Sequence, residues 1–263
     1  MFYGNNSLSP MPGAQMYGMQ SIPGFITGID FGSRYVITVF NSALQSYHFT
    51  TGDIEKELRS LNKRISYTKK SIKSASRLMS KAQTREDAML AAQINNELKN
   101  NLSCLTYTRN ATMRINSQFL VRALFETLPY NSILAIEHQD CFDTYEESKV
   151  KFVREHDILA IYTMIRNTLS IKGIQLVLID RENTSHRCPL CGTTTKDSRN
   201  KKEHMFKCVN CGFLMNDDSV AALNIMLEAE TLVYGQRVTD VDKINIAGLQ
   251  SLNYMMNTYA VSH

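Results

Sequence analysis

The sequence lacks any long apolar segment. No hydrophobic run in its 263 residues reaches the roughly 18 that a membrane-spanning helix requires, so no transmembrane helix is expected. The N-terminus also lacks the charged start and apolar block of a secretory signal peptide. These two absences predict an intracellular, cytoplasmic protein.

Charged residues are missing from positions 1–24, which are rich in Met, Gly, Pro, Ser and Asn. Pro10, Pro12 and Pro23 interrupt regular structure there, so we expect a flexible or loosely docked tail.

Charge elsewhere is uneven. Residues 56–122 hold 14 Lys and Arg against 4 Asp and Glu, although the net charge of the chain is only +4. This asymmetry favours a surface for a polyanion beside an acidic centre, and the alternative is a solvated helical surface. The candidate phosphate contacts are Lys63, Arg64, Lys69, Lys70, Lys73 and Arg77.

The first half of the chain predicts strands followed by a long helical hairpin. Short β-like runs at 25–31, 34–40 and 43–49 are separated by tight turns, which predicts an antiparallel meander. Apolar residues then recur at helical spacing over residues 53–128, with a turn near Ala82–Arg85 and a stop at Pro129. These residues form an apolar stripe along the two helices, and we expect the stripe to pack in the core. Its positions are Ile54, Leu58, Leu61, Ile65, Ile72, Ala75, Met79, Leu98, Leu102, Leu105, Thr112, Ile115 and Phe119.

The second half predicts buried strands at 132–138 and 174–180 on either side of a helix at 149–171. Strand, helix and strand at this length imply right-handed parallel crossovers. A last helix is expected from Asp217-Asp218 to about Tyr234, and residues 236–263 are expected to be a short helix with a frayed end.

Six cysteines fall into two kinds. Cys104 and Cys141 are isolated and are expected to be ordinary, partly buried thiols. The other four form CPLCG and CVNCG, the pattern of a zinc ribbon whose metal has no open position. The predicted zinc ligands are Cys188, Cys191, Cys208 and Cys211. We expect a structural site, with His186 and His204 at the surface or facing nucleic acid.

Three acids stand where predicted elements begin or end. Asp30 ends the first strand in GIDFG, Glu137 ends the fourth in AIEH, and Asp218 starts the last helix. If the two strands are parallel neighbours, all three carboxylates converge at one end of the sheet, where they suit Mg²⁺ or Mn²⁺. The alternatives are a turn residue for each strand acid and an N-cap for Asp218.

The element order predicts an α/β fold with an RNase H-like mixed sheet, an inserted helical hairpin and a zinc-ribbon insertion. The predicted organisation is a core over 25–184 with the hairpin at 53–128, a ribbon over 185–214, a final catalytic helix over 215–235, and a C-terminal extension over 236–263.

The segments ENTSHRCPLCG and FKCVNCGFLMNDDSVAALNI resemble the C-terminal part of TnpB transposon-associated proteins and type V CRISPR nucleases. In that family a zinc ribbon interrupts a RuvC nuclease domain, and GIDFG and AIEH look like its first two catalytic motifs. The family's third motif is Asp, any residue, Asn, Ala, Ala. Here Asp218 takes the catalytic place and Val220 replaces the Asn, with Asp217 as the fallback acid. The resemblance covers about residues 24–234.

The resemblance implies a Mg²⁺- or Mn²⁺-dependent DNA endonuclease of prokaryotic, phage or mobile-element origin. Its guided members carry a large N-terminal lobe that we do not find here, so the leading hypothesis is guide-free cleavage of branched DNA, such as a Holliday junction or flap, or of single-stranded DNA. RuvC acts as a dimer, and Leu249, Leu252, Tyr254 and Met255 offer an apolar surface for a homodimer. The alternatives are an RNA-guided nuclease or its catalytic fragment, with guide RNA as partner, and a non-cleaving nucleic-acid-binding protein.

Overall fold

The computed structural model describes residues 24–32, 35–50, 52–139, 142–143, 156–180, 184–244 and 257–260. Predictions for the tail over residues 1–23, for Cys141, and for Leu249, Leu252, Tyr254 and Met255 therefore lie outside the described residues.

A six-stranded mixed sheet forms the centre of the protein, with the order β5-β4-β1-β2-β3-β9. β1 and β2 are antiparallel, as are β2 and β3, whereas β4 runs parallel to both β1 and β5. The predicted meander, the parallel strands and the α/β class are thus confirmed. The strands are β1 (Ile26–Asp30), β2 (Ile37–Asn41), β3 (Ser46–Thr50), β4 (Ile133–Glu137), β5 (Gln175–Ile179) and β9 (Asn257–Ala260).

The C-terminal extension differs from the prediction. β9 pairs in parallel with β3, so residues 257–260 belong to the sheet and the expected frayed end is wrong there. The pairing places Asn257–Ala260 on the outer edge of β3, which the local sequence pattern did not reveal.

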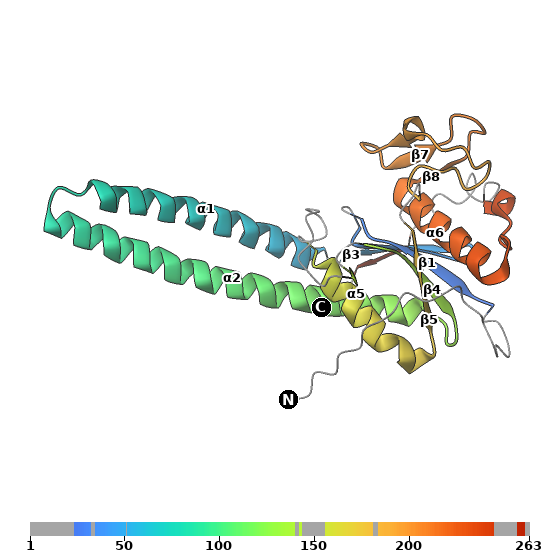
Figure 1. Cartoon of the computed structure of the whole chain (residues 1–263), viewed down its shortest axis with the longest axis horizontal. Coiled ribbons are helices and arrows are strands. Elements are labelled where there is room, and N and C mark those ends of the chain that lie inside the picture. Colours follow the sequence, from blue (N-terminus) through green and yellow to red (C-terminus); the bar gives the residue numbers. More distant parts are fainter. Residues whose placement is uncertain are drawn as a thin grey trace.

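The helical hairpin comprises α1 (Asp53–Lys81) and α2 (Arg85–Thr127), and it projects far beyond the sheet (Figure 1). Its turn lies where predicted, and the Thr84 side chain accepts a hydrogen bond from the Asp87 amide to start α2. The buried part of the stripe includes Ile54, Leu58, Leu61, Ala75 and Leu105.

The stripe is not buried along the whole hairpin. Met79 is 43% exposed and Ile115 is 46% exposed, so both predictions of core packing are wrong. Cys104 is exposed as well, contrary to the expectation of a partly buried thiol. Among the described residues, each helix of the hairpin is covered away from the sheet only by its partner helix, and residues off that narrow contact are exposed.

The predicted helix at 149–171 is shorter in the structure. Residues 149–155 lie outside the described residues, and α5 spans Ile158–Thr168. Asp157 has a left-handed backbone with φ of 52°, which prevents a continuous helix across the predicted start. The last turn, Leu169–Lys172, is a 3₁₀ helix (η1) ending at Gly173.

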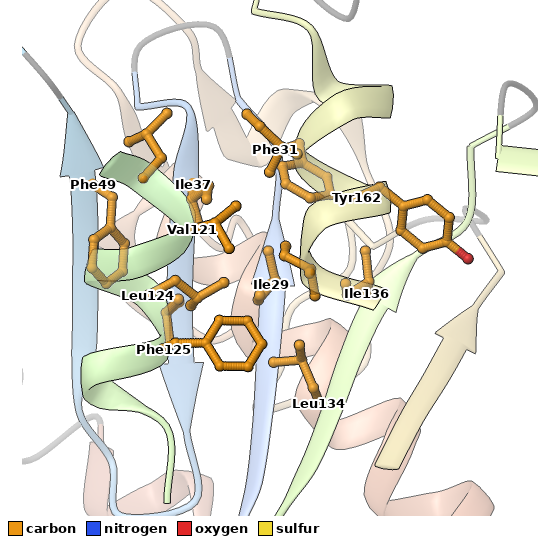
Figure 2. Close-up of a cluster of buried hydrophobic side chains, with 14 of the residues drawn as sticks. Ile29, Phe31, Ile37, Phe49, Val121, Leu124, Phe125, Leu134, Ile136 and Tyr162 are labelled. Carbon is orange, nitrogen blue, oxygen red and sulfur yellow. The ribbon is translucent and has the colours of Figure 1, made fainter. Parts of the chain in front are cut away.

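Helices cover both faces of the sheet. One face packs against α2 and α5, and Figure 2 shows Ile29 and Ile136 facing Val121 and Leu124 there. The other face packs against α6 (Asp217–Tyr234), where Val220, Leu223 and Met226 are buried.

The contact between β1 and α6 is unusually close. A Cβ at Gly28 would lie 2.2 Å from the Ala222 carbonyl oxygen and 2.7 Å from the Met226 amide nitrogen. Gly28 therefore permits α6 to lie directly on β1, which sets the position of the start of α6 relative to the end of β1.

A small three-stranded sheet precedes α6. It consists of β6 (Arg199–Asn200), β7 (Met205–Lys207) and β8 (Leu214–Asn216), all antiparallel, with a 3₁₀ turn η2 (Lys196–Ser198) before it. Phe206 and Phe213 of this module are buried in the same cluster as α6, so the module packs on the core.

Candidate metal centres

Strand alternation directs Asp30 and Glu137 to the face that α6 covers. On β1, Ile26 belongs to the cluster around α6 and Ile29 to the opposite cluster, so Asp30 faces α6. The same argument applies to β4, where Ala135 faces α6 and Ile136 does not. Ile29 pairs with Ile136 in parallel register, so the two acids emerge side by side at the carboxyl end of neighbouring strands.

Asp218 reaches this edge from the first turn of α6. The N-cap is Asn216, whose side-chain oxygen accepts hydrogen bonds from the amides of Asp218 (3.0 Å) and Ser219 (3.1 Å). The Asp218 carboxyl group is therefore not needed as the cap. A Cβ at Gly32 would lie 3.7 Å from the Asp218 carboxyl group, which brings Asp218 beside the segment that follows Asp30.

Two residues of the ribbon module meet the start of α6. Arg199 Nε donates to Asp217 Oδ2 at 2.7 Å, and Arg199 Nη2 lies 3.6 Å from Asp218 Oδ1. His204 Nδ1 lies 3.7 Å from Asp217 Oδ1. The His204 side chain is 32% exposed, so it stays partly at the surface as expected, while one edge of its imidazole lies beside a buried carboxylate.

The four acids impose a high electrostatic cost on one another. Asp30, Glu137, Asp217 and Asp218 are 7%, 7%, 1% and 5% exposed. Burial, followed by the nearby Glu137 and Asp218, raises the pKa of Asp30 well above its usual value, and Arg199 opposes this shift. Among the described residues that act on Asp30, three carboxyl groups raise its pKa and one guanidinium, that of Arg199, lowers it.

Two groups in the described part of the chain have ligand atoms close enough to share one ion. The ligand atoms of His204, Asp217 and Asp218 lie within 4.8 Å of one another, and so do those of the four cysteines. Within the same described ranges, Asp30 and Glu137 do not complete so tight a group with Asp218, although the three interact electrostatically.

Hydrogen bonds from unpredicted residues hold these acids. Thr184 Oγ1 donates to Glu137 Oε1 at 3.0 Å, and Gln139 Nε2 donates to Glu137 Oε2 at 3.1 Å. Ser219 bonds to Ser46 at 2.9 Å and fixes the start of α6 to β3. No pattern in the sequence around Thr184, Gln139 or Ser46 indicates these contacts.

Val220 occupies the position where the resembled motif has Asn. Its side chain is fully buried in the apolar cluster around α6. A different amide holds the ribbon to the helix, because Asn224 Nδ2 donates to the carbonyl oxygens of Thr184 and Arg187, both at 2.7 Å.

The four cysteine sulfurs have the spacing of a tetrahedral metal site. The Sγ atoms of Cys188 and Cys211 are 3.6 Å apart, as are those of Cys191 and Cys208. Zinc–sulfur bonds of about 2.3 Å in a tetrahedron place sulfurs about 3.8 Å apart. The four thiols therefore fit zinc, and the distances are far too long for disulfide bonds.

Two equivalent knuckles create this spacing. The amides of Gly192 and Gly212 each donate at 3.0 Å to the carbonyl oxygen of the first cysteine of their pair, and both glycines have φ of 76°. A side chain would disfavour that left-handed backbone. The hydrogen bond with Thr193 lowers the pKa of Cys191 to about 5, whereas burial raises the pKa of Cys188 and of Cys211, so in the absence of a metal Cys191 is the thiolate of the three.

The six candidate phosphate contacts, Lys63, Arg64, Lys69, Lys70, Lys73 and Arg77, are all exposed on α1. None of them forms an ion pair with an acid of the described ranges, whereas Lys56 and Arg59 at the base of the helix do. Within the described ranges, no helix has the length and apolar character that crossing a membrane requires.

Comparison with known proteins agrees with this architecture. The family model described as Cas12f1-like, TNB domain matches residues 160–225, which contain the four cysteines and the start of α6. The cryo-EM structure of a Cas12f1–sgRNA–target DNA complex is similar with a TM-score of 0.50 and 19% identity, over 78% of this chain and 39% of that chain. A CRISPR–Cas12f ternary complex gives 0.50 and 19%, over 81% and 40%.

No curated protein matches the chain significantly. This chain spans about two fifths of the length of the two structures it resembles. The resemblance to TnpB and type V CRISPR nucleases, which the two cysteine pairs and the Asp218 motif indicated, is confirmed at the level of the domain and the fold.

Proposed function

We propose that the chain is a divalent-metal-dependent DNA nuclease whose catalytic residues are Asp30, Glu137 and Asp218. The observation that carries this proposal is the gathering of buried carboxyl groups from β1, β4 and α6, which together raise the pKa of Asp30 despite the nearby Arg199. Buried like charges require protons or cations for balance, and hard oxygen donors favour Mg²⁺ or Mn²⁺.

In this proposal, residues of the chain bind the ions, orient the carboxylates and balance their charge. Asp30, Glu137 and Asp218 would hold the ions, while Thr184 and Gln139 orient both oxygens of Glu137. A bound pair of such ions supplies an activated water and stabilises the leaving oxygen of a phosphodiester. Arg199 neutralises part of the charge of the neighbouring acids.

We infer a structural role for zinc at the four cysteines. All four ligand positions of a tetrahedron are provided by the chain, so no position remains for a substrate. The ion would hold the module that carries Arg199 and His204 against the start of α6.

We expect single-stranded DNA to be a substrate, and it is the first one to test. The unpaired cations along α1 offer phosphate contacts without base readout. No residue of the described ranges favours a four-way junction over a single strand, so the branched-DNA part of the sequence hypothesis gains no support here.

An RNA-guided reaction is the second candidate, favoured by the shared fold with complexes that contain sgRNA and target DNA. Copurification of a discrete RNA, and cleavage that depends on its sequence, would favour guided cleavage. A non-cleaving binder would instead show salt-sensitive DNA binding with no product in either Mg²⁺ or Mn²⁺.

The test compares Asp30→Ala with Asp180→Ala on labelled single-stranded, flap and junction DNA in Mg²⁺. Asp180 is exposed and follows the neighbouring strand β5, so it controls for loss of an acid at the same sheet edge. We expect Asp30→Ala to lower the rate by at least about 10³-fold, because an ion is lost, while Asp180→Ala cleaves normally. Equal rates in both variants would reject the assignment.

A further inference from the structure

The imidazole of His204 lies in a position that charge balance alone does not explain. Its Nδ1 is 3.7 Å from Asp217 Oδ1, which is too far for a hydrogen bond. Asp217 Oδ1 is buried and has no hydrogen-bond partner among the described residues, because Arg199 engages the other oxygen. A buried carboxylate oxygen without a hydrogen bond costs about 1–3 kcal/mol or more, so a missing partner is expected there.

The backbone holds His204 in this place. Its carbonyl oxygen accepts hydrogen bonds from the Asp217 amide and from Asn216 Nδ2, both at 3.2 Å. Met205 pairs with Asn216 between β7 and β8, so the turn carrying His204 is fixed to the start of α6. The backbone of the ribbon thus holds His204 beside the start of α6, with its imidazole within reach of Asp217.

The spacing of the three ligand atoms suits one cation. Ligands bound at about 2.1 Å to the same ion lie about 3.0–4.2 Å apart, depending on the angle between them. The His204–Asp217 distance of 3.7 Å falls within this range, and the atoms of His204, Asp217 and Asp218 all lie within 4.8 Å of one another.

We propose that His204, Asp217 and Asp218 form a mixed nitrogen and oxygen site for a divalent transition-metal ion. An imidazole ligand suits ions such as Fe²⁺, Ni²⁺ or Zn²⁺, and the two carboxylates also suit Mn²⁺, whereas Mg²⁺ takes oxygen ligands. Because Asp218 also belongs to the proposed catalytic acids, its role in cleavage rests on the function proposed above. The ribbon then supplies a ligand beside the cleavage site as well as support.

Arg199 does not exclude a cation at this site. It contacts Asp217 Oδ2 and approaches Asp218 Oδ1, and therefore leaves Asp217 Oδ1 to face His204. Asp30, Glu137, Asp217 and Asp218 are all buried here, and in the part of the chain that the structure describes Arg199 is the cation that acts on Asp30, so an excess of carboxyl groups remains for divalent ions.

The experiment uses the full chain with its ribbon zinc retained and Mn²⁺ as the probe. Pulsed electron paramagnetic resonance detects coupling between Mn²⁺ and a directly bonded ¹⁴N nucleus. We expect this coupling in the wild type and in His186→Asn, a ribbon histidine outside the group, but not in His204→Asn. Asn tolerates the left-handed backbone of His204, whose φ is 53°, so the turn is expected to fold.

Affinity gives a second readout. His204→Asn should weaken Mn²⁺ binding at the site with Asp217 and Asp218 by about 10–100-fold or more, because loss of even an outer-shell partner lowers metal affinity that much. Unchanged zinc content in this variant would show that the ribbon is intact. Nitrogen coupling that persists in His204→Asn, or that is absent from the wild type, would overturn the site.

The Asp30→Ala variant separates this proposal from the nuclease proposal. It should lose cleavage and keep the nitrogen coupling. A wild type that shows the coupling but cleaves no DNA would sink the nuclease function alone, and a cleaving wild type without the coupling would sink the His204 site alone.

Discussion

The four-cysteine group and the acid cluster lie on adjoining parts of the molecule but are assembled in opposite ways. The four sulfurs come from two knuckles within residues 188–211, each made by a local turn. The acids come from β1, β4 and α6, which are distant in sequence and meet only through the packing of the core. The first site is complete within its own module, whereas the second depends on the whole fold.

The contrast extends to charge. The thiols fill a closed tetrahedron with no position for a substrate. The acids are buried against one another with incomplete compensation, and Asp30 bears that cost as a raised pKa. In the function proposed above, the acids bind and release ions, and a site of that kind keeps unfavourable charge repulsion when it is empty, whereas a closed structural metal site does not.

The largest expected effect is loss of the ribbon. Cys208→Ser removes a buried zinc ligand and should lower the free energy of unfolding by more than about 4 kcal/mol, as loss of a structural metal does. Cleavage should also disappear, because Arg199 and His204 belong to the same module. Zinc content and denaturant unfolding measure this, with Cys104→Ser, an exposed cysteine, as the control within about 0.5 kcal/mol of the wild type.

The next effect tests the packing that brings the acids together. Gly28→Ala introduces a Cβ 2.2 Å from the Ala222 carbonyl oxygen and should cost about 1–3 kcal/mol by displacing α6. Cleavage should fall while zinc content stays normal, because the displacement moves Asp218 and spares the knuckles. Gly24→Ala meets nothing within 4 Å and provides the control. Full activity in Gly28→Ala would show that α6 need not lie so close to β1.

A smaller effect concerns the buried charge itself. Asp30 keeps its proton in the folded, Mg²⁺-free protein at pH values where the unfolded chain has lost it, because burial, Glu137 and Asp218 raise its pKa above 3.8. The free energy of unfolding therefore falls as the pH rises from about 4 through the folded pKa. Asp30→Asn removes this loss and should raise the Tm at pH 8 by about 2–4 °C for each kcal/mol recovered.

Thermal melts at pH 5 and pH 8, in Mg²⁺-free buffer with the ribbon zinc retained, measure this difference. Added Mg²⁺ should stabilise the wild type and have little effect on Asp30→Asn. If the Tm of the wild type and the Tm of Asp30→Asn depended on pH in the same way, the raised pKa of Asp30 would be contradicted.

The smallest effect lies on the hairpin. Replacing Lys70 and Arg77 by Ala should make the slope of log affinity against log salt shallower by about 0.7 for each phosphate of single-stranded DNA that is no longer neutralised. Lys243, which pairs with Asp240, serves as the control lysine. Binding isotherms measured at several salt concentrations give the slope, and identical slopes would remove α1 from the interface.

Local patterns predicted the strands, the hairpin, the knuckles and the start of α6. Strand alternation and apolar periodicity depend on nearby residues, so they can be read directly from the chain. The sequence did not predict β9, the exposure of Met79, or the break at Asp157, because each depends on what a distant segment covers or constrains.

The candidate metal centres show the same difference between features set by nearby residues and features set by distant ones. Asp30, Glu137 and Asp218 were identified by their places at element ends, and the structure gathers them electrostatically. Arg199, His204 and Thr184 were not identified as partners of the acids, because only the packing of the ribbon on α6 brings them there.

The central claim is that these acids hold divalent cations, and anomalous diffraction from a Mn²⁺-soaked crystal tests it most directly. We expect a peak within about 2.0–2.6 Å of a carboxylate oxygen of Asp30 and of one from Glu137 or Asp218, apart from any peak at His204. A well-ordered map at saturating Mn²⁺ with no peak beside Asp30 would contradict the account.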